Sequence, residues 1–80
     1  MALLGQKPPQ KPHDVVVTDG DAYVESTLVR WDENSLHIQS TGVFRRGRIR
    51  VFPLHPEEDG LYEIHGEFVA LKDGLLLLRY

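Results

Sequence analysis

The arginines of this chain are concentrated in one stretch of the sequence. Five of the six lie between Arg30 and Arg50, and Arg46 and Arg50 stand at the spacing R-x-x-x-R within the run RGRIR. Guanidinium groups form paired, charge-assisted hydrogen bonds with phosphate and carboxylate oxygens. The cluster therefore predicts a face that binds phosphate or an acidic partner surface, made by Arg30, Arg45, Arg46, Arg48 and Arg50. Arginines on a strand can also remain solvated and deter pairing between sheet edges, and this interpretation stays open.

Two phenylalanines, Phe44 and Phe52, lie among these arginines. Aromatic rings that stack on bases, together with cations that contact phosphates, form the usual surfaces for single-stranded nucleic acid. However, the chain has a net charge of -3, and acidic residues dominate from Glu57 to Asp73. Because this balance gives no general attraction to nucleic acid, nucleic-acid binding is the alternative function and not the leading one.

The residue types that usually carry catalysis are not arranged for it. The chain has no cysteine, and no serine stands in the G-x-S-x-G context of an acyl-transfer nucleophile. Glu63, His65 and Glu67 would share one face of a strand, but a metal site needs ligands that converge from several elements. We therefore expect neither an enzyme nor a metal or cofactor site.

Short segments with the alternation of β-strands position these residues. The expected strands cover 14–18, 22–30, 35–40, 48–54, 61–70 and 75–80. Turn signals recur roughly every ten residues, including an Asp-Gly pair after the first strand, and no segment has a helical period. This pattern predicts an all-β fold, a small six-stranded antiparallel β-barrel. With RGRIR at the start of the fourth strand, Arg46, Arg48 and Arg50 would share one face, continued by Phe52.

The chain is expected to divide into an arm and one domain. Residues 1–13 hold three of the five prolines, which favour extended conformations, so we predict a flexible arm before a single barrel domain at 14–80. No apolar run approaches the roughly 18 residues that cross a bilayer. We expect no membrane insertion and a cytoplasmic protein.

The last strand, Leu75–Tyr80, has the sequence LLLLRY and is apolar on both faces. In so small a domain a strand of this kind must be covered, either by closure of the barrel or by another chain. At a sheet edge it would predict a protein partner or self-association. Trp31, beside a predicted turn, could stack on a ligand, but we expect it to close one end of the barrel.

The order of strands and turns resembles that of PilZ domains, six-stranded bacterial β-barrels whose typical members bind cyclic di-GMP. The segments that carry the resemblance are TLVRWDENSLHI, FRRGRIRVFPL and YEIHGEFVALKDGLLLLRY, about two thirds of the chain. The resemblance implies the barrel fold and a role in bacterial signalling that controls motility, pili or exopolysaccharide.

The two ligand motifs of PilZ domains fall on different residue types here. The family's R-x-x-x-R corresponds to KPPQK, where Lys7 and Lys11 keep the spacing. Its D/N-x-S-x-x-G corresponds to RWDENS, with Arg30, Asp32 and Ser35 at the three motif positions. Lysine lacks the two-pronged hydrogen bonding of arginine, and Asp32 would repel phosphate. The resemblance therefore implies a divergent, non-catalytic adaptor that acts mainly through protein partners, without cyclic di-GMP binding in the family's usual mode.

Overall fold

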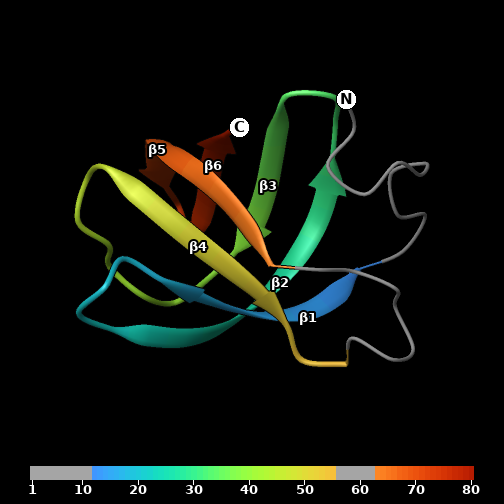
Figure 1. Ribbon diagram of the computed structural model, residues 1–80, viewed down its shortest axis with the longest axis horizontal. Coiled ribbons are helices and arrows are strands. Elements are labelled where there is room, and N and C mark those ends of the chain that lie inside the picture. The colour runs from blue at the N-terminus through green and yellow to red at the C-terminus, as the bar shows by residue number, and fades with distance from the viewer. Residues whose placement is uncertain (1–11, 56–62) are drawn as a thin grey trace.

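The computed structural model describes residues 12–55 and 63–80, which form six β-strands. The strands are β1 (His13–Thr18), β2 (Tyr23–Trp31), β3 (Ser35–Gln39), β4 (Arg48–Pro53), β5 (Ile64–Lys72) and β6 (Leu75–Arg79). Figure 1 shows them wrapped round a common interior. The predicted fold class, a small six-stranded antiparallel β-barrel, is confirmed.

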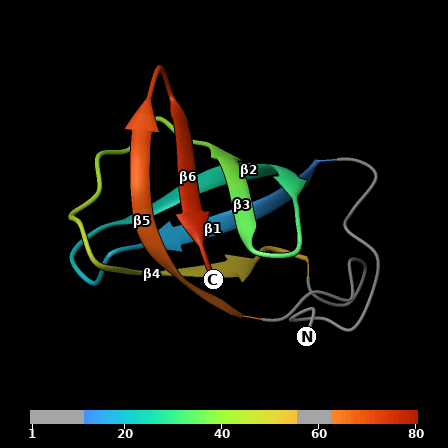
Figure 2. The same ribbon diagram turned by 90° about the horizontal axis from the view of Figure 1, so that it is seen from above.

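The barrel closes through pairing of the first and fourth strands. The strand order is β1-β2-β3-β6-β5-β4, and β4 returns to β1, where Val17 lies opposite Val51. All six pairings are antiparallel. Figure 2 shows the β5–β6 hairpin running steeply across β1 and β4, as expected of a small, strongly twisted barrel. β6 therefore lies between β3 and β5 and is not an edge strand.

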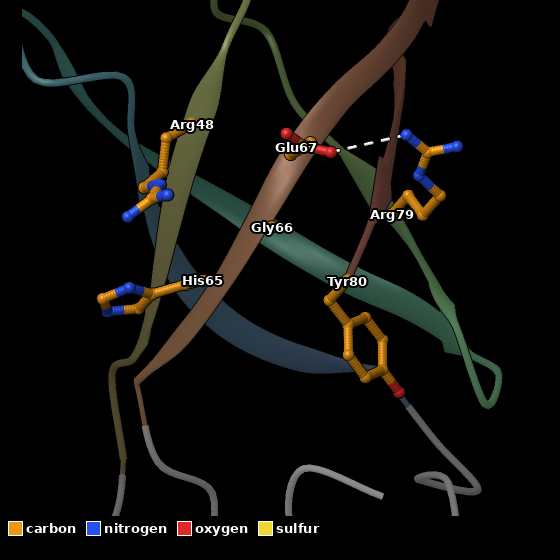
Figure 3. A pocket seen from close by; sticks show the side chains of 6 residues that line it. All are labelled: Arg48, His65, Gly66, Glu67, Arg79 and Tyr80. Carbon is orange, nitrogen blue, oxygen red and sulfur yellow. Dashed lines mark hydrogen bonds and ion pairs between the residues drawn. The ribbon is translucent and has the colours of Figure 1, made fainter. Parts of the chain in front are cut away.

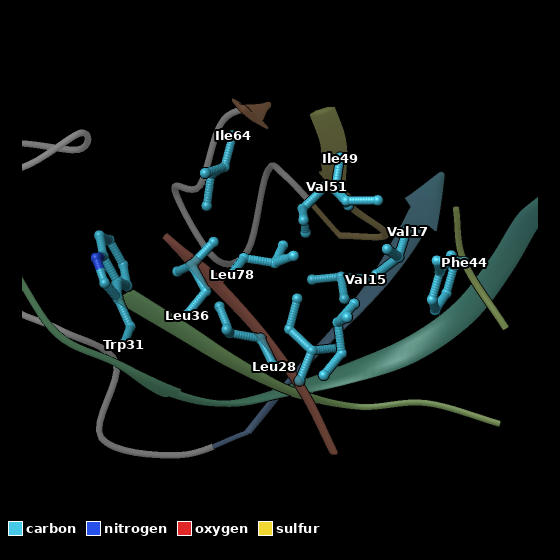
Figure 4. Packing of buried hydrophobic residues seen from close by; sticks show 12 residues of the cluster. Val15, Val17, Leu28, Trp31, Leu36, Phe44, Ile49, Val51, Ile64 and Leu78 are labelled. Carbon is cyan, nitrogen blue, oxygen red and sulfur yellow. The ribbon is translucent and has the colours of Figure 1, made fainter. Parts of the chain in front are cut away.

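Alternate residues of the strands fill the interior with apolar side chains. The fully buried ones include Leu28, Leu36, Ile38, Ile49, Leu76 and Leu78. Figure 4 shows Trp31 at one end of this cluster and Phe44 at the other. Trp31 is only 3% exposed, so it closes one end of the barrel as predicted. Burial of each large apolar side chain contributes about 1.5 to 3 kcal/mol, and this term holds the small domain together.

Asp-Gly pairs form two of the hairpin connections. Asp73 and Gly74 join β5 to β6 with φ angles of 54° and 78°. Positive φ at both central residues is the type I′ geometry, whose twist matches that of the flanking strands. Between β1 and β2, the Asp19 carboxylate accepts hydrogen bonds from two backbone N–H groups of its own turn. The Asp-Gly turn predicted after the first strand is therefore present.

β6 directs leucines to both sides of the barrel wall. Leu76 and Leu78 are fully buried, whereas Leu75 is 39% exposed and Leu77 is partly exposed. Beside them, β5 has a bulge that includes Val69, which is 42% exposed. Barrel closure thus covers the backbone and the inner leucines of β6, but an apolar strip remains on its outer face.

The first strand begins at His13, and most of the predicted arm lies outside the described residues. Lys7 and Lys11, which take the place of the arm arginines, are among the residues outside that range. Within residues 12–55 and 63–80 no helix is long and apolar enough to span a membrane.

Candidate functional site

A row of charged side chains crosses the outer face of β4, β5 and β6. The strand register places Arg48 opposite Glu67, and Glu67 opposite Arg79. Adjacent strands are about 4.8 Å apart, so the three side chains are direct cross-strand neighbours. Figure 3 shows Glu67 between the two arginines, with its carboxylate turned toward Arg79. The Glu67–Arg79 ion pair has a length of 3.4 Å.

This row borders a surface hollow of about 490 Å³, which we call the cationic hollow. It is lined by Arg48, His65, Gly66, Glu67, Arg79 and Tyr80. Gly66 allows β5 to approach β6 closely, because a Cβ atom there would lie only 3.2 Å from the carbonyl oxygen of Arg79. The absence of a side chain at this position therefore shapes the wall of the hollow.

Tyr80 is fastened to the turn between β2 and β3. Its hydroxyl donates to the carbonyl oxygen of Asp32 and accepts from Trp31 Nε1, each at 2.6 Å. Its backbone N–H donates to the carbonyl oxygen of Asn34 at 3.2 Å. Desolvation raises the pKa of the Tyr80 hydroxyl above its usual value, although the bond from Trp31 works in the opposite direction. The phenol is therefore a protonated, fixed border of the hollow.

The cations on this face differ in how far they are neutralised. Arg79 pairs with Glu67, and Arg50 lies 3.8 Å from Glu63. Arg48 forms no ion pair or hydrogen bond with any residue that the structure describes. Ion pairs between exposed side chains are weak, so Arg79 can exchange its partner at little cost. The hollow thus offers one unpaired guanidinium group and a second that is easily released.

Two apolar hollows continue along β6 from the cationic one. The first, of about 250 Å³, lies between Ser35, Val69, Leu77 and Arg79. The second, of about 660 Å³, is lined by residues of β3, β5 and β6 that include Gln39, Ala70, Lys72, Leu75 and Leu77. Arg79 lines both the cationic hollow and the first apolar one, and Leu77 lines both apolar ones. The three hollows form one continuous surface on the outer face of β6, which we call the β6 groove.

Three predicted site residues, Arg30, Asp32 and Ser35, meet at the β2–β3 turn. The Asp32 carboxylate accepts hydrogen bonds from Arg30 Nε at 3.4 Å and from the Ser35 hydroxyl at 3.2 Å. His37 Nε2 lies 3.5 Å from the same carboxylate. Desolvation alone would raise the pKa of Asp32, but the charge of Arg30 and the bond from Ser35 outweigh it and lower the pKa. These groups satisfy one another and hold the turn, and Ser35 also borders the groove.

Arg45 lies away from the groove, at the β1–β2 hairpin. Its backbone N–H donates to Asp19 Oδ2 at 2.7 Å, and its guanidinium group pairs with Asp21. The bond from Arg45 and those from the turn's own N–H groups lower the pKa of Asp19 to about 2. Because its hydrogen-bonding groups are used within the fold, Arg45 acts as a clamp between the hairpin and the chain before β4.

Arg46 precedes β4 and does not lie on it. The chain turns at Gly47, where φ is 115°, and β4 begins at Arg48. The guanidinium group of Arg46 lies over the ring of Phe68, 5.5 Å from its centroid. Arg48 and Arg50 therefore lie on β4, as predicted, whereas the prediction that Arg46 shares their face is wrong.

The aromatic rings near the arginines are covered within the fold. Arg50 lies over Phe52 at 5.4 Å from the ring centroid, and Phe44 is 6% exposed in the core. A nucleic-acid base would have to displace a guanidinium group before it could stack on Phe52. Neither Phe44 nor Phe52, the two rings on which the nucleic-acid alternative depends, is thus free to stack on a base.

Five of the six lining residues of the cationic hollow were not among the predicted site residues: His65, Gly66, Glu67, Arg79 and Tyr80. Arg79 and Tyr80 do belong to the strand Leu75–Tyr80, which was predicted as a partner surface, and the register of β4, β5 and β6 brings Glu67 and Arg79 beside Arg48. The alternation of LLLLRY does indicate that Arg79 points outward, but its neighbours across the strands cannot be read from the sequence. Among the described residues, no group of three or more His, Asp or Glu side chains is placed to hold a metal ion.

Comparison of the chain with protein-family models, with curated proteins and with solved structures finds no match.

Proposed function

We propose that this chain is a non-catalytic binding module that takes an extended segment of a partner protein into the β6 groove. The groove itself is the observation that carries the proposal: it is apolar beside Leu75 and Leu77 and cationic beside Arg48 and Arg79. The interior of so small a barrel is filled by its core, so a ligand must bind on the outer surface.

The partner is recognised through side chains. The backbone of β6 is already paired on both sides, with β3 and with β5, so the partner cannot add a strand to it. The five residues of β6 span about 17 Å, which suits about five residues of an extended segment. Apolar side chains of the partner cover Leu75, Leu77 and Val69, while an acidic side chain meets Arg48 and Arg79.

The two ends of the groove also fix the direction of the segment. Apolar contact supplies roughly 25 cal/mol for each Å² removed from water, without directionality. A segment bound in reverse would place its acidic side chain beside Leu75 and Leu77, where the charges of Lys72 and Asp73 offset each other. The two guanidinium groups of Arg48 and Arg79 stand against one glutamate, so the cationic end favours one orientation of the segment.

The resemblance to PilZ domains supports the further proposal that the module is an adaptor in bacterial signalling linked to cyclic di-GMP. The closed six-stranded barrel is compatible with this resemblance. We do not propose direct binding of cyclic di-GMP, because Arg30, at the first position of the family's second ligand motif, forms an ion pair with Asp32.

The test is a fluorescence-anisotropy screen of labelled peptides of about eight residues in which apolar positions and one acidic position are scanned. Groove variants Leu77→Glu and Arg79→Gln are compared with the parent protein. Val43→Glu is the control for the first, because Val43 is 83% exposed and lies outside the groove. Arg30→Gln is the control for the second, because the side chains of Arg30 and Arg79 are both 69% exposed and each forms an ion pair at 3.4 Å.

We expect the bound peptides to carry an acidic residue beside apolar ones. Both groove variants should weaken binding about tenfold or more, and both controls should leave it unchanged. Binding that survives Leu77→Glu would contradict the proposal. An RNA oligonucleotide that binds the parent, and that is lost in Arg79→Gln but not in Leu77→Glu, would favour the nucleic-acid alternative.

A further inference from the structure

We propose that the cationic hollow binds a dianionic phosphate group, carried by a phosphorylated side chain of the partner segment. This inference rests on the proposed function, because the segment in the β6 groove brings the phosphate to the hollow. It goes further in naming the chemical group that the hollow selects.

Two guanidinium groups flank the place where the phosphate binds. Arg48 and Arg79 stand on either side of Glu67 in one cross-strand row, two strand spacings or about 10 Å apart at their Cα atoms. Figure 3 shows Arg48 on the β4 side of the hollow and Arg79 on the β6 side. Both side chains are long, so their ends can turn toward a common oxyanion above Glu67. A hollow of about 490 Å³ leaves ample room for one phosphate group.

Glu67 is the reason for inferring phosphate and not carboxylate. Its own carboxylate already lies 3.4 Å from Arg79, and its place on β5 keeps it there at a high effective concentration. A carboxylate ligand would replace this pair with an equivalent one and add a negative charge beside Glu67. It therefore gains less from the hollow than a dianion that bonds both guanidinium groups.

A phosphate monoester differs in both charge and geometry. It carries a charge of about -1.5 to -2 at neutral pH and three strong acceptor oxygens, so it can bond Arg48 and Arg79 at the same time. Among the side chains that line the hollow, two arginines stand against one glutamate, so these side chains carry a net positive charge even with His65 uncharged. The second guanidinium bond outweighs the repulsion from Glu67, and Glu67 thereby favours phosphate over carboxylate.

The experiment uses three peptides that share the best-binding sequence of the screen and differ only at the acidic position, which is phosphoserine, glutamate or serine. Each is titrated against the parent and against Arg48→Gln, Glu67→Gln and the control Arg30→Gln. Phenyl phosphate is the free probe, followed through the Nε–Hε NMR signals of the arginines. These signals test the hollow whether or not any peptide binds.

We expect the phosphoserine peptide to bind the parent about tenfold to a hundredfold more tightly than the glutamate peptide. Arg48→Gln should abolish this preference, and Arg30→Gln should preserve it. Glu67→Gln should reduce the preference, because the glutamate peptide should bind this variant more tightly than it binds the parent. Phenyl phosphate should shift the signals of Arg48 and Arg79, with lower affinity than the phosphopeptide.

The two proposals fail in different ways. If the glutamate and phosphoserine peptides bind equally, or if the preference survives Arg48→Gln, the phosphate inference is wrong and the groove remains. Phenyl phosphate that leaves Arg48 and Arg79 unshifted also overturns the inference. If phenyl phosphate binds as tightly as the phosphopeptide, and equally in Leu77→Glu, a free phosphate compound and not a partner segment is the ligand.

Discussion

Replacement of Tyr80 by phenylalanine tests whether the last residue fastens β6 to the β2–β3 turn. The substitution keeps the ring but removes the hydroxyl that bonds both Trp31 Nε1 and the Asp32 carbonyl oxygen at 2.6 Å. Trp31 is 3% exposed, so its N–H is left largely without water or another acceptor. A buried donor left without a partner costs about 1 to 3 kcal/mol, and we expect Tyr80→Phe to lower the free energy of unfolding by that amount.

The assay is urea unfolding followed by tryptophan fluorescence, with Tyr23→Phe as the control because Tyr23 is 65% exposed. In a domain of this size 1 kcal/mol corresponds to about 4 to 8 °C in Tm, so thermal unfolding provides a second readout. Folding raises the pKa of Tyr80 above 10.0. The protonated hydroxyl therefore makes its full contribution to the free energy of unfolding below pH 10, and this contribution is lost as the pH rises through the pKa of the folded state. The difference in the free energy of unfolding between the parent and Tyr80→Phe should therefore become smaller in strong alkali. A loss no larger than that of Tyr23→Phe would refute this account of the contact.

Three further predictions concern the barrel. Leu78→Ala should destabilise the protein by about 2 to 5 kcal/mol in urea unfolding, since Leu78 is fully buried; a value below about 1 kcal/mol would show that this part of the core is loosely packed. Gly74→Ala should lower the free energy of unfolding by about 1 to 2 kcal/mol, because φ at this position is 78°. The new Cβ atom itself has room, since the nearest atom, the carbonyl oxygen of Ser40, would lie 3.6 Å away. An unchanged free energy of unfolding would mean that the turn changes type. Asp19→Ala should lower Tm at pH 7. Because the pKa of Asp19 falls from 3.8 to about 2 on folding, the difference in Tm from the parent should be complete above pH 4 and should vanish as the pH falls through 2. A difference in Tm that does not depend on pH would contradict the ionic role of this carboxylate.

The fold could be predicted from the sequence because local signals agree along the chain. Leu36 and Ile38 alternate with polar neighbours, and both are fully buried in β3. The Asp-Gly pair at Asp73 and Gly74 marks the last hairpin as clearly as its φ angles do. Such signals depend on residues next to one another in sequence, which is the information that a single chain displays.

The site could be predicted only in part, because it depends on which strands are neighbours. Arg48 was singled out from the arginine run, but Arg79 and Glu67 join it through the order β4-β5-β6, and a single sequence does not show strand order or register. The strand LLLLRY, apolar on both faces, was predicted to need a cover, either from barrel closure or from another chain. Barrel closure provides this cover for Leu76 and Leu78 and leaves Leu75 and Leu77 on the surface.

The same limit explains why the arginine run does not form one face. The turn at Gly47, with φ of 115°, separates Arg46 from β4, and the hydrogen bond from Arg45 to Asp19 ties that residue to another hairpin. Spacing in the sequence predicts a common face only where the strand is continuous, and here the strand begins at Arg48.

The central claim is that the β6 groove is the binding surface, and chemical-shift mapping tests it most directly. Uniformly ¹⁵N-labelled protein is titrated with the pooled peptide library, and the backbone amide shifts are assigned to residues. We predict that the largest shifts fall on Leu75–Arg79 and on the facing part of β5 around Val69. Shifts confined to exposed residues outside the groove, such as Tyr23 and Val43, or no shifts at millimolar peptide, would contradict the account.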